Sequence, residues 1–293
     1  MYEANDAYGR PFAFLVDPRT HLHTVVLACA PADETPEGTT DAGWIAACER
    51  RLVGLPAGAV GATLVAEAFA DAPTQLRTTI ALTYPATAYG TQPRRTPSQL
   101  AVTLGALLPG LCASLQGAGV TTVPLTGRQV TVAVRNAYDP GAAALLDRSE
   151  PAAGPHWHDV APLSSRDLWD HFRHDGACSV SWVASPPQGD HLPPQWGGAL
   201  TPPPDQVAAQ RLAFLYEPVT ADGAGTLTPF AAVATATVRH VDDLRRAVAV
   251  KHGLTDAVRG RLRRAFGGQA GAFAAGLPLG VTAADGLSPR VFH

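Results

Sequence analysis

The sequence predicts an α+β protein made of two ferredoxin-like antiparallel sheet-and-helix sandwiches in tandem. Strand-like runs come in neighbouring pairs, and helices follow the pairs instead of alternating with single strands, which disfavours a parallel doubly wound sheet. This arrangement occurs once in each half of the 293-residue chain. We therefore expect an N-terminal domain over residues 1–147 and a C-terminal domain over residues 148–293, the latter carrying a Pro-rich linker at 185–205.

Local patterns predict the elements of the first half. The segment Asp17–Thr20 has turn chemistry and lies between two β-rich runs, which indicates a hairpin. Thr40 or Asp41 is suited to cap a helix, and Pro97 is suited to the first turn of another. The expected strands are Arg10–Val16, His21–Cys29, Ala62–Phe69 and Leu76–Tyr84, and the expected helices run from Asp41 to Val53, from near Pro97, and from Thr126 to Ala137.

The second half is interpreted in the same way. Ser164 or Ser165 is expected to cap a short helix carrying Leu168, Trp169 and Phe172, with Gly176 ending it. The other expected elements are strands over Cys178–Ala184, Arg211–Tyr216, Phe230–Arg239 and Val258–Phe266, a helix from Asp242 to about Lys251, and a helix over Gln269–Ala275.

One apolar stretch resembles a membrane span. Residues 96–127 carry no charge, but the apolar part, Leu100–Leu115, is shorter than the about 20 residues that a span needs, and Pro109 interrupts it. Its leucines recur at helical spacing along one stripe. We expect a packed amphipathic helix in a soluble chain.

Composition excludes several functions. The chain has 22 Lys and Arg residues against 25 Asp and Glu residues, and Lys251 is its single lysine. That lysine lies in Ala-Val-Lys-His-Gly, without the glycine-rich loop of a P-loop ATPase. The net charge of −3 argues against binding a polyanion by bulk attraction. The four cysteines are widely spaced, which indicates buried thiols in a reducing compartment.

Histidine pairs leave a metal-dependent hydrolase open as an alternative function. Imidazoles at such spacings, joined by a carboxylate, are typical ligands of zinc. The pairs are His21 with His23, His156 with His158, and His171 with His174 beside Asp170 and Asp175. There is no His-Glu-x-x-His motif and no Cys-x-x-Cys motif. We therefore expect no bound metal, no cofactor and no catalytic residue, and a structural role for His174.

A basic run near the C-terminus is the candidate binding surface. Between Arg239 and Arg264 there are eight Arg or Lys residues and three Asp residues. Arg259, Arg261 and Arg263 are expected on one face of a strand, with Arg264 beside them, where they would bind a partner. In a plainer interpretation, these arginines are only solvated or protect the edge of the sheet from pairing. A further alternative is that they bind DNA and that the protein is a DNA-binding adaptor.

Several strings resemble one protein family. The most specific is Trp169-Asp170-His171-Phe172-Arg173-His174-Asp175-Gly176. Supporting strings are Gly9–Phe14, Leu107–Cys112, Ala137–Pro140, Leu215–Pro218 and Gln269–Gly280. Together they resemble actinobacterial conjugation- and secretion-associated membrane proteins, and the last string is also similar to the segment before the motor of TrbE/CagE-type secretion ATPases.

The resemblance implies a non-motor subunit of a conjugative, type IV-like DNA-transfer or secretion apparatus. It would dock to a separate motor ATPase and to membrane components, with self-association as another possibility. Family members carry two membrane helices that have no counterpart in this sequence, so we expect a soluble fragment or a soluble relative. It would lie in the cytoplasm at the inner face of the membrane. Partner proteins would hold it there, or an N-terminal anchor that is missing from this sequence.

Overall fold

The structure is a computed structural model. It describes residues 1–31, 41–53, 58–70, 72–85, 95–117, 119–142, 156–185, 207–218, 227–254 and 256–281. The expected Pro-rich linker at 185–205 and the expected boundary near residues 147–158 fall almost entirely outside the described residues.

One large antiparallel sheet forms the framework, so the α+β class is confirmed. The strands are β1 (Tyr2–Asn5), β2 (Pro11–Val16), β3 (Leu22–Pro31), β4 (Gly61–Phe69), β5 (Ala72–Pro85), β6 (Val120–Pro124), β7 (Ser165–Asp167), β8 (Phe172–His174), β9 (Ala177–Ala184), β10 (Ala209–Pro218), β11 (Leu227–Val238) and β12 (Arg263–Arg264). Their order is β1-β2-β3-β5-β4-β10-β11-β9-β8-β7, with β6 beside β3 and β12 beside β9.

The two halves of the chain follow the same strand order. The first half runs β6-β3-β5-β4, and the second half runs β12-β9-β11-β10. Each half also extends its sheet with a hairpin, β1–β2 in one and β7–β8 in the other. The halves meet edge to edge where β4 pairs with β10 in antiparallel register, so the expected domains share a single sheet.

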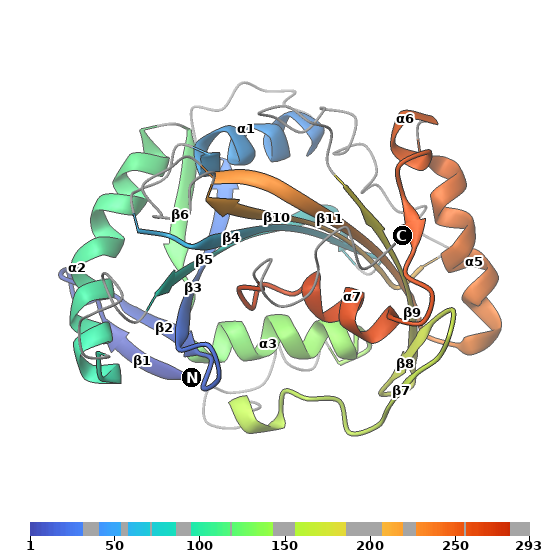
Figure 1. Ribbon diagram of the computed structural model, residues 1–293, viewed down its shortest axis with the longest axis horizontal. Helices are drawn as coiled ribbons and strands as arrows, with labels where there is room; N and C mark the ends of the chain where they lie inside the picture. The colour runs from blue at the N-terminus through green and yellow to red at the C-terminus, as the bar shows by residue number, and fades with distance from the viewer. Residues whose placement is uncertain are drawn as a thin grey trace.

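The sheet curves into an arch, and helices cover both of its faces (Figure 1). The helices are α1 (Asp41–Val53), α2 (Pro97–Gln116), α3 (Gly127–Tyr138), α5 (Leu244–Ala249), α6 (Asp256–Arg259) and α7 (Gln269–Ala275), with 3-10 turns η2 (Trp157–Asp159), η4 (Val241–Asp243) and η5 (Val250–Gly253). The helices α1, α2, α5 and α6 lie on the convex face, and α3 and α7 lie inside the arch.

Side-chain alternation along the strands supplies both apolar layers. In β10, Leu212, Phe214 and Tyr216 belong to the main core under the outer helices, whereas Ala213 and Leu215 belong to a second core cluster with α7. Successive residues of a strand point to opposite faces, so a strand covered on both sides reads as continuously apolar. This explains why β10 was recognisable in the sequence.

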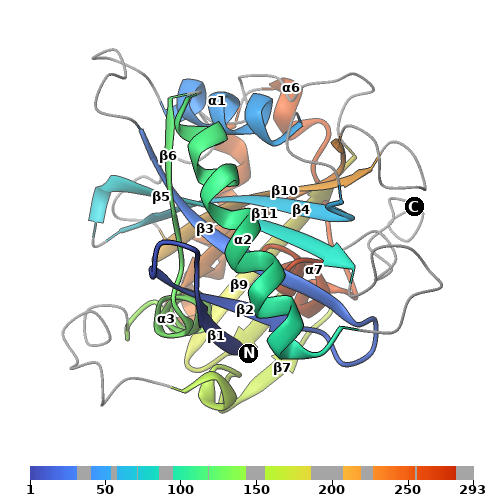
Figure 2. The same ribbon diagram turned by 90° about the vertical axis from the view of Figure 1, so that its left-hand side faces the viewer.

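Helix α2 matches the expected leucine-striped helix. Thr96 and Gln99 form a capping box, Pro97 occupies the first turn, and the stripe that includes Leu104 is buried. Figure 2 looks onto α2, which passes over the strands beside β6. A Cβ on Gly105 would lie 2.9 Å from the Asn5 carbonyl oxygen, so glycine is required for β1 to approach the helix. By length and composition α2 could also cross a membrane.

Most of the expected elements are confirmed, but two are wrong. The helix expected from Ser164 to Gly176 is instead the hairpin β7–β8, with Asp175 and Gly176 in left-handed conformations between β8 and β9. The strand expected over Val258–Phe266 is mostly the short helix α6 and a turn, and only Arg263 and Arg264 pair with β9. In both places a tertiary neighbour overrides the local pattern, because β9 offers an edge on which short segments can pair.

A buried ion pair lies at the junction of the two halves. Glu67 of β4 and Arg211 of β10 are register partners, and the Arg211 Nε atom is 2.5 Å from the Glu67 Oε1 atom. Both side chains are buried, and the Arg211 guanidinium also lies over the Phe273 ring of α7. The pair therefore couples the strand junction to the helix beneath the arch.

Candidate functional site

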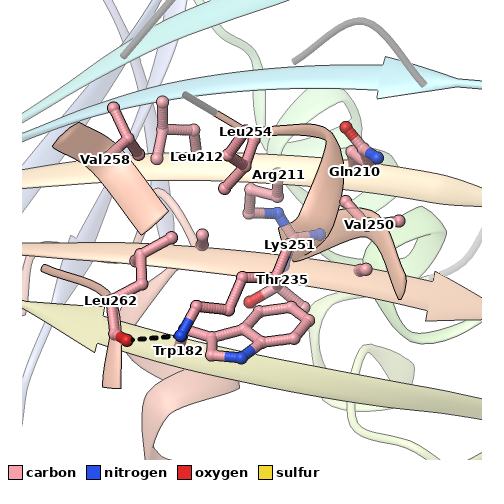
Figure 3. A pocket seen from close by; sticks show the side chains of 12 residues that line it. Trp182, Gln210, Arg211, Leu212, Thr235, Val250, Lys251, Leu254, Val258 and Leu262 are labelled. Carbon is pink, nitrogen blue, oxygen red and sulfur yellow. Dashed lines mark hydrogen bonds between the residues drawn. The ribbon is translucent and has the colours of Figure 1, made fainter. Parts of the chain in front are cut away.

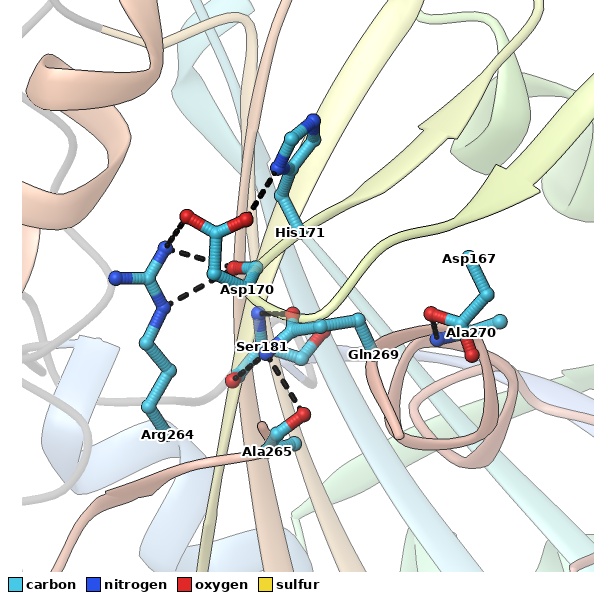
Figure 4. Close-up of polar contacts among 8 residues, drawn as sticks. All are labelled: Asp167, Asp170, His171, Ser181, Arg264, Ala265, Gln269 and Ala270. Atoms are coloured by element: carbon cyan, nitrogen blue, oxygen red, sulfur yellow. Dashed lines mark hydrogen bonds and ion pairs between the residues drawn. The ribbon is translucent and has the colours of Figure 1, made fainter. Parts of the chain in front are cut away.

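The structure brings together two segments that lie far apart in the chain, the Trp169–Gly176 string and the basic run that ends at Arg264. The turn between β7 and β8 carries Trp169 and Asp170, and it lies against β12 and the residues that follow it. We call this contact the aromatic–arginine surface, and it consists of Trp169, Asp170, Arg264 and Phe266, with Arg261 and Arg263 beside it in the chain. Figure 4 shows Arg264 reaching the turn beside Asp170.

Polar contacts fix the turn to β12. Arg264 donates from Nε and Nη2 to the Asp170 carbonyl oxygen at 3.1 and 2.7 Å. The Asp170 carboxylate accepts from the His171 ring at 2.8 Å and lies 3.5 Å from the Arg264 Nη2 atom. The hydrogen bond from His171 and the charges of His171 and Arg264 hold the pKa of Asp170 below its usual value, despite some burial. The carboxylate therefore stays ionised and keeps its partners at neutral pH.

Above this polar base, two aromatic rings face solvent. Trp169 is 71% exposed and Phe266 is 52% exposed. Their rings are stacked, with centroids 6.0 Å apart, and the Arg264 guanidinium lies 5.3 Å from the Phe266 centroid. Gly267 holds the stack in place, because its amide donates to the Trp169 carbonyl oxygen at 2.8 Å. The surface thus presents a rigid aromatic platform with a cation at its side.

Helix α7, which lies inside the arch, supports the segment that precedes Phe266, and Figure 4 shows its Gln269 side chain bonded to Ser181 and Ala265. The Gln269 side chain is fully buried, accepts from the Ser181 amide at 2.8 Å, and donates to the carbonyl oxygens of Ser181 and Ala265. Asp167 accepts from the Ala270 amide at 3.1 Å, which ties β7 to the first turn of α7. One buried amide side chain thereby replaces the strand pairing that ends after Arg264.

The arginines lie differently from the expectation. Arg259 ends α6 and pairs with Asp256, whereas Arg263 and Arg264 are consecutive strand residues. Arg259, Arg261 and Arg263 therefore do not share one strand face, which corrects that prediction. Arg261 and Arg263 are exposed, while Arg264 is partly buried by its contacts with Asp170. Arg261 and Arg263 therefore present exposed cations in the chain segment that leads to Phe266.

His174 lies in the interior instead of the last turn of a helix. Its Nδ1 atom is 2.5 Å from the Tyr138 carbonyl oxygen, and its Nε2 atom is 2.8 Å from the Ser179 hydroxyl, which also bonds Thr237. Burial lowers the pKa of His174 to about 4, although the Tyr138 carbonyl raises it in part. The neutral ring thus links α3 to two strands, and neither nitrogen is available to a metal.

The other motif residues divide between the two faces of the sheet. Asp175 forms an ion pair with Arg135 of α3 at 2.5 Å. Arg173 is exposed on β8, on the opposite side from Phe172 and His174, which are buried against Phe273. The motif string is therefore mainly architectural, and only Trp169, Asp170 and Arg173 face outward enough to meet a ligand.

The histidine pairs do not assemble a metal site within the described residues, where no group of three or more His, Cys, Asp or Glu side chains could hold an ion. The rings of His156 and His158 stack on each other, with centroids 5.5 Å apart. His23 is buried against Tyr84, and burial together with the charge of Arg95 lowers its pKa to about 4. His171 bonds the neighbouring Asp170 instead of pairing with His174.

The single lysine serves the fold. Lys251 donates to the Leu262 carbonyl oxygen at 2.8 Å and tethers η5 to the segment before β12. Figure 3 shows it above Trp182, in a pocket lined by residues of η5, α6 and the strands beneath, most of them apolar. The pocket has a volume of about 20 Å³, which is room for about one water molecule. It is too small for a ligand.

Sequence reasoning missed the contribution of Gly267 and Gln269 and the partnership of Trp169 with Phe266. The sequence offers only a tryptophan in a segment that was expected to be helical, followed much later by Phe266-Gly267-Gly268. No spacing rule connects residues so far apart in the chain.

Comparisons with known proteins do not identify a family. No protein-family model matches the chain. No curated protein matches it. Among solved structures, it is similar to the crystal structure of an anthrone oxidase-like protein, with 13% identity over 90% of each chain and a TM-score of 0.21. That score is too low to carry an argument about fold or activity.

Proposed function

We propose that this chain is a non-enzymatic assembly subunit of a conjugative, type IV-like DNA-transfer or secretion apparatus, and that it docks to a separate motor ATPase through the aromatic–arginine surface. The observation that carries the proposal is the exposed Trp169–Phe266 stack, fixed from beneath, with Arg261 and Arg263 exposed in the chain segment that leads to Phe266. Tryptophan and arginine are the side chains that most often dominate the binding energy of protein interfaces.

The resemblance of the Trp169–Gly176 string to secretion-associated proteins supports the choice of apparatus. The arginines support an acidic docking site on the partner, because guanidinium groups pair well with carboxylates. We also propose that each half is a ferredoxin-like unit, since β6-β3-β5-β4 and β12-β9-β11-β10 both have the strand order of that fold. In this interpretation the halves are tandem sandwiches fused along β4 and β10. The family resemblance further supports the proposal that the chain works at the inner face of the membrane.

The first experiment measures binding to a separate secretion-type motor ATPase. We expect Trp169→Ala to weaken binding by about 30-fold, the effect of losing an interface hot spot of about 2 kcal/mol. Arg261→Glu with Arg263→Glu should slow association most at low salt. Leu163→Ala is the matched control, because Leu163 is 93% exposed and lies away from the turn. Unchanged binding in the Trp169 variant, or no binding by the unmodified protein, would refute the proposal.

A DNA-binding adaptor is the second candidate. An aromatic stack beside arginines also suits single-stranded nucleic acid, whose bases stack on exposed rings. The distinguishing measurement is the affinity for a short single-stranded DNA at increasing salt. Binding that falls steeply with salt and is lost in Trp169→Ala would favour this candidate over protein docking.

A further inference from the structure

A second basic site lies at the opposite end of the β7–β8 hairpin from Trp169. Here a groove of about 420 Å³ opens between the hairpin and the start of η4. We call it the arginine groove, and its charged walls are Arg166, Arg173, Arg239, His240, Asp175 and Asp242. The volume falls in the range of sites that hold small molecules.

Two of these arginines are placed directly against each other. Arg166 and Arg173 are register partners in β7–β8, so their side chains emerge on the same face of the sheet. Like charges at directly opposite positions destabilise a strand pair. The juxtaposition therefore costs stability unless an anion lies between the two guanidinium groups.

The protein itself supplies little compensating charge. Within the described residues, the Arg166 side chain has no hydrogen bond or ion pair, and the polar partner of the Arg173 guanidinium is the Cys178 thiol, whose pKa burial raises and Arg173 lowers. Asp175 is already paired with Arg135. Asp242 is the remaining carboxylate in the groove, while Arg239 and His240 add further basic groups to it.

We propose that the arginine groove binds a phosphomonoester group through Arg166 and Arg173. Such a group carries between about −1.5 and −2 charges near neutral pH, which matches two guanidinium groups, and its oxygens suit the forked arginine donors. Among the described residues, no Phe, Tyr or Trp ring lines the groove, so recognition rests on the phosphate and not on a stacked base. The group can belong to a small soluble molecule or to a lipid headgroup.

The test uses the full chain with inorganic phosphate as the soluble probe and vesicles as the lipid probe. The vesicles contain phosphatidic acid in phosphatidylcholine, with pure phosphatidylcholine for comparison. Binding is measured by calorimetry and vesicle flotation at constant ionic strength. Arg166→Gln and Arg173→Gln should each weaken phosphate binding by at least about tenfold, the effect of losing a charge-assisted hydrogen bond. Arg19→Gln, an exposed arginine on another turn, should not.

Binding of either probe that depends on Arg166 and Arg173 supports the proposal and identifies the source of the phosphate. The proposal is overturned if neither probe binds, if the Arg166→Gln variant binds phosphate as tightly as the unmodified protein, or if chloride binds as tightly as phosphate. A second measurement separates ligand binding from a structural role. Without phosphate, Arg166→Gln should melt at the same temperature as the unmodified protein or higher, because repulsion from Arg173 is relieved. A lower melting temperature would show that Arg166 serves the fold instead.

Discussion

The indole of Trp169 lies over the ring of Phe266, with the two planes 20° apart, although the residues belong to different elements. The contact depends on Gly267, whose backbone is left-handed, with φ of 73°. A Cβ at this position would lie 2.8 Å from the Trp169 ring. The glycine thus allows the two rings to stack while its amide bonds the Trp169 carbonyl oxygen.

Gly267→Ala should therefore destabilise the fold and displace Trp169. A left-handed backbone costs a residue with a Cβ about 1–2 kcal/mol, and the contact with the indole adds to that cost. The free energy of unfolding in urea measures the loss. Gly268→Ala is the control, since its φ is −145° and a Cβ there meets nothing within 4 Å. Equal losses in the two variants would contradict the assigned role of Gly267.

Gln269→Ala should be the most damaging single change beneath the aromatic–arginine surface. It removes three hydrogen bonds and leaves the Ser181 amide buried without its partner, which costs about 1–3 kcal/mol for each unsatisfied group. Thermal unfolding checks this, with the exposed Gln116→Ala as the control. A melting temperature close to that of the control would mean that the buried amide contributes little.

The Glu67–Arg211 pair predicts strong coupling across the junction of the halves. Arg211→Met leaves the Glu67 carboxylate buried and unpaired, and should cost about 3–5 kcal/mol. Adding Glu67→Leu should recover much of that loss, because no charge then remains buried. A double-mutant cycle in urea gives the coupling energy. Simple additivity of the two single changes would argue against a coupled pair.

Two buried histidines predict that acid weakens the fold. Burial lowers the pKa of both His23 and His174 to about 4, below the usual 6.5. Between these values the unfolded chain binds more protons than the folded chain, so stability falls as the pH drops. Each histidine should contribute a slope of at most about 1.4 kcal/mol per pH unit.

Urea unfolding between pH 7 and pH 5.5 measures this slope before most carboxylates titrate. The slope is proportional to the number of protons that the chain takes up on unfolding. His174→Gln should lower that number by about one, whatever its effect on stability at pH 7. His252→Gln, which replaces an exposed histidine, is the control variant. A slope that is the same in all three proteins would contradict the burial of a neutral His174.

Elements with their own local signals were predictable. The turn at Asp17–Thr20 bonds its own backbone through Asp17, and Thr96 and Thr126 each cap a helix through a box completed three residues later. Such contacts join residues close in sequence, so a short window contains both partners. The predictions for residues 164–176 and 258–266 were wrong for the opposite reason. Both segments owe their conformation to the edge of β9, which no local window contains.

The sequence alone determined the α+β class, the long strands and the capped helices, because periodicity and capping are local properties. Only the tertiary structure decided that the two halves share one sheet and that Trp169 meets Phe266 and Arg264. It also decided that His174 is buried and that Arg166 faces Arg173. These relationships arise from strand pairing and from burial inside the arch, where residues distant in the chain share a low-dielectric environment or one face of a sheet.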